Sequence, residues 1–137
     1  MYRPEFSAFA VLVVEDDAFV RRSIVRMLRA MGFVEVKEAA EGEAALQTLK
    51  AMPQCGVVLC DIGMKPVGGL QFLERLRKEF IPPLSDTPVI FITGSADSET
   101  VKRAMTMKAA GYVLKPVVPD KLSARIATTL KLPGAPA

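Results

Sequence analysis

The sequence alternates five short runs of strand-like character with five stretches of helical periodicity, and few folds accommodate such an alternation. Four of the runs are almost wholly apolar, which is typical of strands buried on both faces of a parallel sheet. These four are residues 10–14, 57–60, 89–92 and 112–114. The fifth run, 33–39, alternates apolar and charged residues, as a half-exposed edge strand does.

The segments after these runs carry apolar residues three or four positions apart, which predicts an amphipathic helix in each segment. We expect helices over 18–31, over 42–52, after Gly68-Gly69, from Asp97 or Ser98 to about Ala110, and from Pro119 onward. This strict alternation predicts the α/β class, with a doubly wound five-stranded parallel sheet and helices on both faces.

The composition excludes several kinds of functional site. The 137-residue chain has no histidine, and its two cysteines, Cys55 and Cys60, do not form a C-x-x-C pair. A zinc or haem site and a histidine-activated nucleophile are therefore excluded. No apolar run is long enough to span a bilayer, and the run at 10–14 is too short for a signal peptide. We expect a cytoplasmic protein with free thiols and no membrane contact.

The charge is unevenly distributed along the chain. From Val101 onward there are seven basic residues and one acidic residue, a net charge of +6, whereas residues 1–100 carry −3. This asymmetry is compatible with an acidic partner or simply with solvated helix faces. No cluster of Lys and Arg with interleaved aromatic residues indicates nucleic acid binding.

Polar residues capable of chemistry stand at the ends of four predicted strands. They are Glu15, Asp16 and Asp17 after the first, Asp61 after the third, Thr93 after the fourth and Lys115 after the fifth. Parallel strands bring their carboxyl ends to one edge of the sheet, where ligands of this architecture bind. A polar strand end is ordinary by itself, but a set of acids, a hydroxyl and a lysine predicts a shared site.

The predicted site suits phosphoryl transfer with a divalent cation. Carboxylates and carbonyls are the ligands that Mg²⁺ prefers. Phosphoryl transfer needs an in-line nucleophile and positive charge on the phosphoryl oxygens. We expect Asp61 to be the nucleophile, Lys115 and Mg²⁺ to neutralise these oxygens, and Thr93 to donate a hydrogen bond to one of them.

These residues resemble the receiver domains of bacterial response regulators. The matching pieces are Val13-Val14-Glu15-Asp16-Asp17, Leu59-Cys60-Asp61, Met64 with Gly69-Leu70, Ile92-Thr93-Gly94 and Gly111-Tyr112-Val113-Leu114-Lys115-Pro116. The resemblance covers roughly residues 9–131 and implies a flavodoxin-like sheet with strand order 2-1-3-4-5. It divides the chain into a flexible N-terminus (1–8), the receiver domain (9–131) and a flexible tail or linker stub (132–137).

The resemblance implies a role for each site residue. Asp61 is the phosphorylation site, Thr93 and Lys115 assist the transfer, and Thr93 and Tyr112 act as switch residues. The implied Mg²⁺ ligands are Glu15 acting mainly through water, Asp16, Asp61 and the backbone carbonyl of Gly63. The Lys115-Pro116 peptide bond is implied to be cis. Asp17 matches no ligand, and we expect it to cap the first helix.

The implied function is that of a signalling module in a two-component system rather than an enzyme. The phosphoryl donor would be a histidine kinase or a histidine phosphotransfer protein. The output would pass through the fourth helix, fifth strand and fifth helix to a downstream partner with an acidic surface. We expect a monomer or weak dimer that binds no nucleic acid by itself.

Some alternatives and departures qualify this interpretation. The chain is also compatible with the receiver part of a longer regulator that has a DNA-binding or enzymatic output domain, and with a pseudo-receiver that is not phosphorylated. A haloacid-dehalogenase-type phosphatase would need a second Asp where this chain has Gly63.

Three residues near the predicted site depart from the family's pattern or are unusually small. Lys65 replaces the family's usual proline, and Gly63 and Ser95 are small. We expect an open site with a short to intermediate phosphoryl lifetime.

Overall fold

The structure is a computed structural model that describes residues 2–64 and 67–136. Its strands are β1 (Ala10–Val14), β2 (Glu35–Ala39), β3 (Cys55–Asp61), β4 (Val89–Thr93) and β5 (Gly111–Leu114). Its α-helices are α1 (Ala18–Met31), α2 (Gly42–Lys50), α3 (Gly69–Glu79), α4 (Glu99–Thr106) and α5 (Pro119–Thr129). Two short 3-10 helices are η1 (Pro4–Ala8) and η2 (Leu84–Asp86). The strands form one parallel sheet in the order β2-β1-β3-β4-β5, which confirms the predicted fold.

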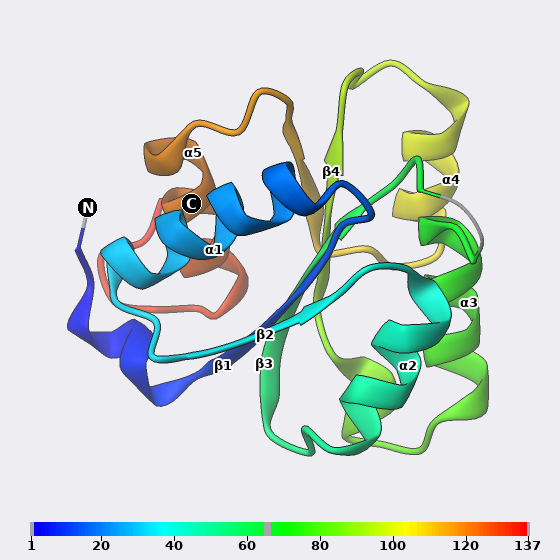
Figure 1. The fold of residues 1–137 in the computed structure, drawn as a ribbon, viewed down its shortest axis with the longest axis horizontal. Coiled ribbons are helices and arrows are strands. Elements are labelled where there is room, and N and C mark those ends of the chain that lie inside the picture. The colour runs from blue at the N-terminus through cyan, green and yellow to red at the C-terminus, as the bar shows by residue number, and fades with distance from the viewer. Residues whose placement is uncertain (1, 65–66, 137) are drawn as a thin grey trace.

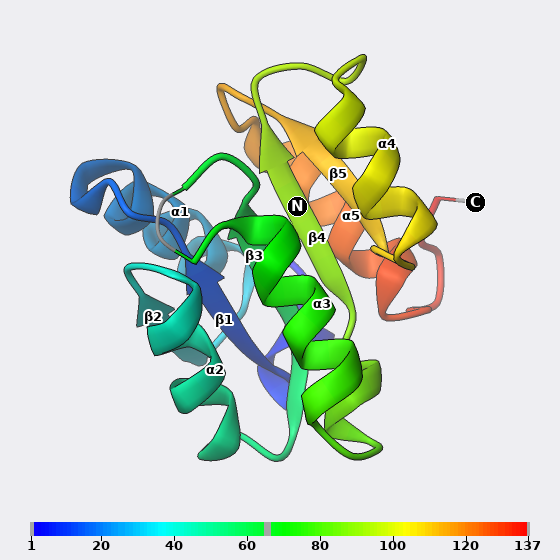
Figure 2. The same ribbon diagram turned by 90° about the vertical axis from the view of Figure 1, so that its right-hand side faces the viewer.

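The helices cover both faces of the sheet. Helices α1 and α5 pack on one face, and α2, α3 and α4 pack on the other (Figure 1). Figure 2 looks onto the second face, with α2 and α3 in front of the strands. Successive residues of a strand point to opposite faces, so Val11 and Val13 of β1 join the core under α1 and α5, while Leu12 and Val14 join the other core. The interiors of the central strands are therefore apolar, as the sequence predicted, and polar residues stand at the ends of β3 and β4.

Helix α1 has the predicted bounds because both of its ends are set locally. The side chain of Asp17 accepts a hydrogen bond from the backbone N–H of Val20 at 3.0 Å, as an N-cap does. Gly32 ends the helix with a φ of 124°, a conformation that residues with a Cβ rarely adopt. A Cβ at Gly32 would also collide with the backbone carbonyl of Arg3, so this helix end depends on glycine.

Helix α4 is shorter than predicted. Ser98 caps its N-terminus by accepting a hydrogen bond from Val101 N, but the helix ends at Thr106 instead of about Ala110. The reason is that Lys108 adopts a φ of 66°, which leaves the right-handed helical conformation. The following residues turn into β5.

Side chains near both ends of the chain contact the rest of the domain. In η1 the side chain of Phe6 is buried and stacks on Phe33, with 4.5 Å between the ring centroids. Near the other end, Leu132 packs against the core, and the Thr128 hydroxyl donates to the carbonyl of Pro136 at 2.7 Å. The apolar side chains in these segments extend the core below α1 and α5. Among the residues described, no helix is long and apolar enough to cross a membrane.

Candidate functional site

Three carboxylates gather at the carboxyl ends of β1 and β3. Glu15 and Asp16 directly follow β1, and Asp61 is the last residue of β3. Each of these side chains offers an oxygen atom that lies within 4.8 Å of the others. Glu15 and Asp61 are buried, whereas Asp16 is exposed. The predicted convergence of these acids is therefore present in the fold.

Glu15 is held by its neighbours at several points. Its backbone N–H donates to the carbonyl of Ala39 on β2 at 3.1 Å. Its carboxylate oxygen Oε2 accepts a hydrogen bond from the backbone N–H of Asp17 at 3.2 Å. The other oxygen, Oε1, is buried and has no hydrogen bond within the described chain. A buried oxygen without a donor is costly and calls for a cation or water.

Lys115 brings the nearest positive charge to these acids. Its Nζ lies 3.4 Å from Oε1 of Glu15 and 3.4 Å from Oδ1 of Asp61, so one ammonium group bridges the two carboxylates. The contact with Glu15 is within ion-pair distance but lacks the geometry of a hydrogen bond. One lysine does not balance three carboxylates, and the cluster has a net charge of −2 when all four groups are ionised.

The electrostatics of the cluster disfavour full ionisation. Burial of its carboxyl group is the main reason that the pKa of Glu15 is raised to about 7. The neighbouring acids Asp16 and Asp61 raise this pKa further, while the N–H of Asp17 and the charge of Lys115 lower it. Burial alone would lower the pKa of Lys115, but the charges of Asp61 and Glu15 outweigh it and the pKa is raised.

The donor set suits a hard divalent cation. All three candidate side chains offer carboxylate oxygens, which Mg²⁺ prefers to nitrogen or sulfur. A cation of charge +2 would neutralise the cluster, and a water molecule bound to it could donate to Oε1 of Glu15. The residues present therefore fit the predicted Mg²⁺.

Gly63 lies beside the predicted nucleophile. Its backbone N–H donates to Oδ1 of Asp61 at 3.2 Å, while its predicted role was to offer its carbonyl to the metal. Among the described residues, the nearest neighbour of a Cβ built on Gly63 would be Oδ1 of Asp61, at 3.9 Å. A larger side chain could therefore stand over the carboxylate. Lys65, the residue at the usual proline position, lies outside the described residues, as does Pro66.

Thr93 stands at the predicted place but its hydroxyl group is engaged elsewhere. It is the last residue of β4 and is buried. Its hydroxyl donates to the carbonyl of Ser95 at 3.2 Å and accepts from the N–H of Ser95 at 3.3 Å. The backbone carbonyl of Thr93 accepts from the N–H of Lys115 at 2.7 Å, which ties the two strand ends together.

Comparison with known proteins identifies the family. The sequence matches the model of the response regulator receiver domain over residues 11–127. The chain belongs to this family. It is 32% identical over 130 residues to the chemotaxis protein CheY of Treponema pallidum, an alignment that covers 94% of this chain and 88% of that protein. It is 34% identical over 127 residues to the probable transcriptional regulator ycf27 of Cyanophora paradoxa, covering 93% of this chain but 50% of that protein.

Solved receiver structures share the fold. The CheX-CheY-BeF3-Mg²⁺ complex from Borrelia burgdorferi matches with a TM-score of 0.78 and 26% identity, over 88% of this chain and 87% of that chain. Receiver domains are signalling modules of two-component systems, and they bind Mg²⁺ at an acidic cluster such as the one formed here by Glu15, Asp16 and Asp61. The chain spans most of the first relative and about half of the second.

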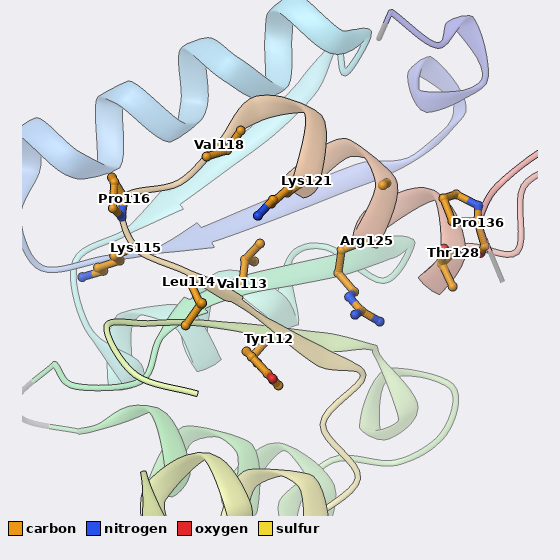
Figure 3. A pocket seen from close by; sticks show the side chains of 11 residues that line it. Tyr112, Val113, Leu114, Lys115, Pro116, Val118, Lys121, Arg125, Thr128 and Pro136 are labelled. Atoms are coloured by element: carbon orange, nitrogen blue, oxygen red, sulfur yellow. Dashed lines mark hydrogen bonds between the residues drawn. The ribbon is translucent and has the colours of Figure 1, made fainter. Parts of the chain in front are cut away.

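The receiver domain has a groove between β5 and α5 that contains the predicted switch residue. Figure 3 shows Tyr112 and Leu114 from β5 on one side of this groove, with Lys121 and Arg125 from α5 on the other. The groove has a volume of about 500 Å³, and the Tyr112 side chain is half-buried in it. The Lys115-Pro116 peptide bond at the end of β5 is cis.

One residue of the receiver site was missed by the sequence analysis. The side chain of Arg21, in the first turns of α1, reaches back to the loop that carries the acids. Its Nη1 donates to the carbonyl of Glu15 at 2.7 Å, and its Nε bonds Oε1 of Glu38 at 3.0 Å. The only sequence signal was a basic residue beside the apolar stripe of a helix, which is too common to single out.

Proposed function

We propose that this receiver domain accepts a phosphoryl group on Asp61 from a phosphohistidine of a histidine kinase or phosphotransfer protein. The observation that carries the proposal is the bridging of Asp61 and Glu15 by Lys115, at 3.4 Å from each, within a cluster of three carboxylates. In this step an Asp61 carboxylate oxygen forms a bond to phosphorus. The bond from phosphorus to the donor nitrogen breaks, and its electron pair stays on the imidazole, which takes up a proton.

The residues around Asp61 are arranged to support this step. The N–H of Gly63 and Nζ of Lys115 both contact Oδ1, so that oxygen is held in place. Within the described chain no hydrogen bond engages Oδ2, which is available as the attacking atom. Lys115 would follow the negative charge onto the phosphoryl oxygens. The Thr93 hydroxyl, now bonded to Ser95, would rotate to donate to one of them.

The metal has a limited and defined part in the proposal. Bound Mg²⁺ would supply positive charge to the phosphoryl oxygens during transfer. Asp16, Asp61 and the carbonyl of Gly63 would bind it directly, with Glu15 mainly through water. The similar structure from Borrelia burgdorferi is a complex with BeF3 and Mg²⁺, which supports a part for Mg²⁺ in the function of this chain.

A small phosphodonor tests the proposal without a cognate kinase. The protein is incubated with acetyl phosphate, with and without Mg²⁺, and its intact mass is measured beside an Asp61→Asn variant. We expect a single phosphoryl adduct that requires Mg²⁺ and is absent from the variant. If Mg²⁺ binds but no adduct forms, the domain is a pseudo-receiver and the proposed transfer is wrong.

The signal would leave through the surface formed by α4, β5 and α5. Apolar residues on this surface are exposed, with Met105 and Val118 44% exposed and Leu114 48% exposed. Lys121 and Arg125 border the groove beside Tyr112, which favours an acidic partner segment with an apolar side chain. Acetyl phosphate with Mg²⁺ is expected to shift the amide NMR signals of α4 and β5. Shifts confined to the Asp61 loop would argue against this output route.

We also propose three further properties of this chain. They are the domain bounds at residues 9–131, a monomeric or weakly dimeric state, and a cytoplasmic location. The family match over residues 11–127 lies inside the proposed bounds. Relatives such as ycf27 are about twice as long as the matched region, so a receiver of this kind also occurs as one part of a larger regulator.

A further inference from the structure

We propose that Arg21 is a positioning residue that, together with Glu38, sets the Mg²⁺ affinity of the receiver site. The inference rests on the metal site of the proposed function and concerns the loop that follows β1. Within the described chain, Arg21 forms no hydrogen bond or ion pair with Asp61 or with the carboxylate of a metal ligand. It acts through the backbone of Glu15.

The geometry of Arg21 is that of a clamp between two strands. Its guanidinium donates through Nη1 to the carbonyl of Glu15 at 2.7 Å and through Nε to Oε1 of Glu38 at 3.0 Å. The side chain is only 16% exposed, so it is held within the structure and does not extend into solvent. Glu38 lies on β2 at the register position opposite Val13 of β1. The clamp therefore fixes the β1–α1 loop to the neighbouring strand.

The clamp completes the immobilisation of Glu15. The backbone N–H of Glu15 donates to the carbonyl of Ala39, and Oε2 accepts from the N–H of Asp17. Arg21 also donates a hydrogen bond to the backbone carbonyl of Glu15, so the N–H and the C=O of this residue are both held by hydrogen bonds. Only Oε1 is left without a hydrogen bond in the described chain, and it faces Lys115 in the acidic cluster.

The clamp matters most for Asp16. This side chain is exposed, so packing does not fix its position, and the orientation of its backbone decides where its carboxylate points. The carbonyl held by Arg21 belongs to the peptide group between Glu15 and Asp16. Rotation of this peptide group would move Asp16 away from Asp61. A group that orients a metal ligand in this way typically changes metal affinity by ten- to a hundred-fold.

Glu38 has a second effect besides orienting the guanidinium. An unpaired arginine beside the acidic cluster would repel a divalent cation, and the charge of Glu38 compensates that of Arg21. The pair can therefore supply two directed hydrogen bonds without a net positive charge near the site. Lysine would keep the charge but could not bond both acceptors in the same geometry.

The experiment titrates Mg²⁺ into metal-free protein by isothermal calorimetry. The variants are Arg21→Ala, Arg21→Lys, Glu38→Gln and the double variant Arg21→Ala/Glu38→Gln, with Arg22→Lys as the matched control on the exposed side of α1. We expect about tenfold weaker binding for Arg21→Ala. We expect a smaller loss for Arg21→Lys and for Glu38→Gln, and none for Arg22→Lys. The double variant is expected to match Arg21→Ala, because Glu38 acts through Arg21.

Thermal unfolding in EDTA separates positioning from a merely structural role. A structural role would lower the unfolding temperature while leaving the Mg²⁺ dissociation constant of the folded protein unchanged, and this result would overturn the inference. Tighter binding in Arg21→Ala would overturn it too, since only charge repulsion would then be at work. If wild-type protein shows no Mg²⁺ binding that Asp16→Asn abolishes, the proposed function itself fails, and the clamp fails with it.

Discussion

The ammonium group of Lys115 lies 3.4 Å from Oδ1 of Asp61, at the point where β3 and β5 end. Replacing Lys115 with Gln is expected to slow phosphorylation by acetyl phosphate about a hundred-fold, because one charged donor to the phosphoryl oxygens is lost. The same variant is expected to bind Mg²⁺ more tightly, because three carboxylates then face the cation without a competing charge. Rates from intact mass and affinities from calorimetry check the two opposite effects. Lys115→Arg, which keeps the charge, should retain more activity, and equal loss in both variants would contradict this role.

The raised pKa of Glu15 predicts how stability depends on pH in the absence of metal. An ordinary glutamate has a pKa of 4.5, and burial raises that of Glu15 to about 7. Between these values the folded protein binds more protons than the unfolded chain, so the free energy of unfolding falls as pH rises from about 4.5 to 7. The loss is on the order of 1 to 3 kcal/mol. Urea unfolding in EDTA across this range measures it.

Two changes should remove this pH dependence. Glu15→Gln resembles the protonated carboxyl group at every pH, so its stability should stay level over the same range. Mg²⁺ stabilises the ionised form, so it should offset the loss near pH 7 in the wild type, whereas this variant has no such loss to offset. A wild-type stability that rises from pH 5 to pH 7 in EDTA would contradict the raised pKa.

Adjacent residues Asp16 and Asp17 should have separable roles. Asp17 caps α1 through its bond to Val20 N, so Asp17→Ala is expected to lose about 1 kcal/mol of stability while retaining Mg²⁺ affinity. Asp16→Ala is expected to lose Mg²⁺ binding with little loss of stability, because its exposed side chain contributes a like charge to the cluster. Thermal unfolding in EDTA and Mg²⁺ titration of both variants measure the two properties. Asp17→Asn keeps the capping oxygen and serves as the control.

The space beside Gly63 should determine the lifetime of the phosphoryl group. Among the described residues, a Cβ at this position would lie nearest to Oδ1 of Asp61, at 3.9 Å, so larger residues fit without a collision at that atom. Gly63→Leu is expected to slow dephosphorylation about fivefold by excluding water from the acyl phosphate. This corresponds to an activation barrier that is higher by roughly 1 kcal/mol. Gly63→Ala, which adds little bulk, should change the rate much less. Loss of the intact-mass adduct over time after removal of acetyl phosphate gives both rates.

The parts of the fold that could be predicted are those set by local sequence. The bounds of α1 follow from the capping side chain of Asp17 and from Gly32, and the parallel strands follow from their apolar runs. The predicted end of α4, at about Ala110, was wrong. Apolar residues continue with helical spacing after Thr106, although the backbone turns at Lys108. Hydrophobic periodicity does not reveal a single residue that leaves the helical conformation.

The parts that could not be predicted depend on contacts between distant segments. The acids of the site were predictable because strand ends converge by topology. The clamp by Arg21 was not, because it depends on the register that places Glu38 on β2 opposite Val13 of β1. The contact of the N-terminal segment with the domain was likewise not predictable, since nothing near Phe6 in the sequence indicates its stacking partner Phe33.

The most direct test of the central claim locates the phosphoryl group on the chain. Protein treated with acetyl phosphate and Mg²⁺ is reduced with borohydride, which converts an aspartyl phosphate to homoserine, and its peptides are sequenced by mass spectrometry. We predict homoserine at position 61 and at no other aspartate, dependent on both acetyl phosphate and Mg²⁺. Unmodified Asp61 in protein that carries a phosphoryl adduct, or homoserine at another aspartate instead, would contradict the account.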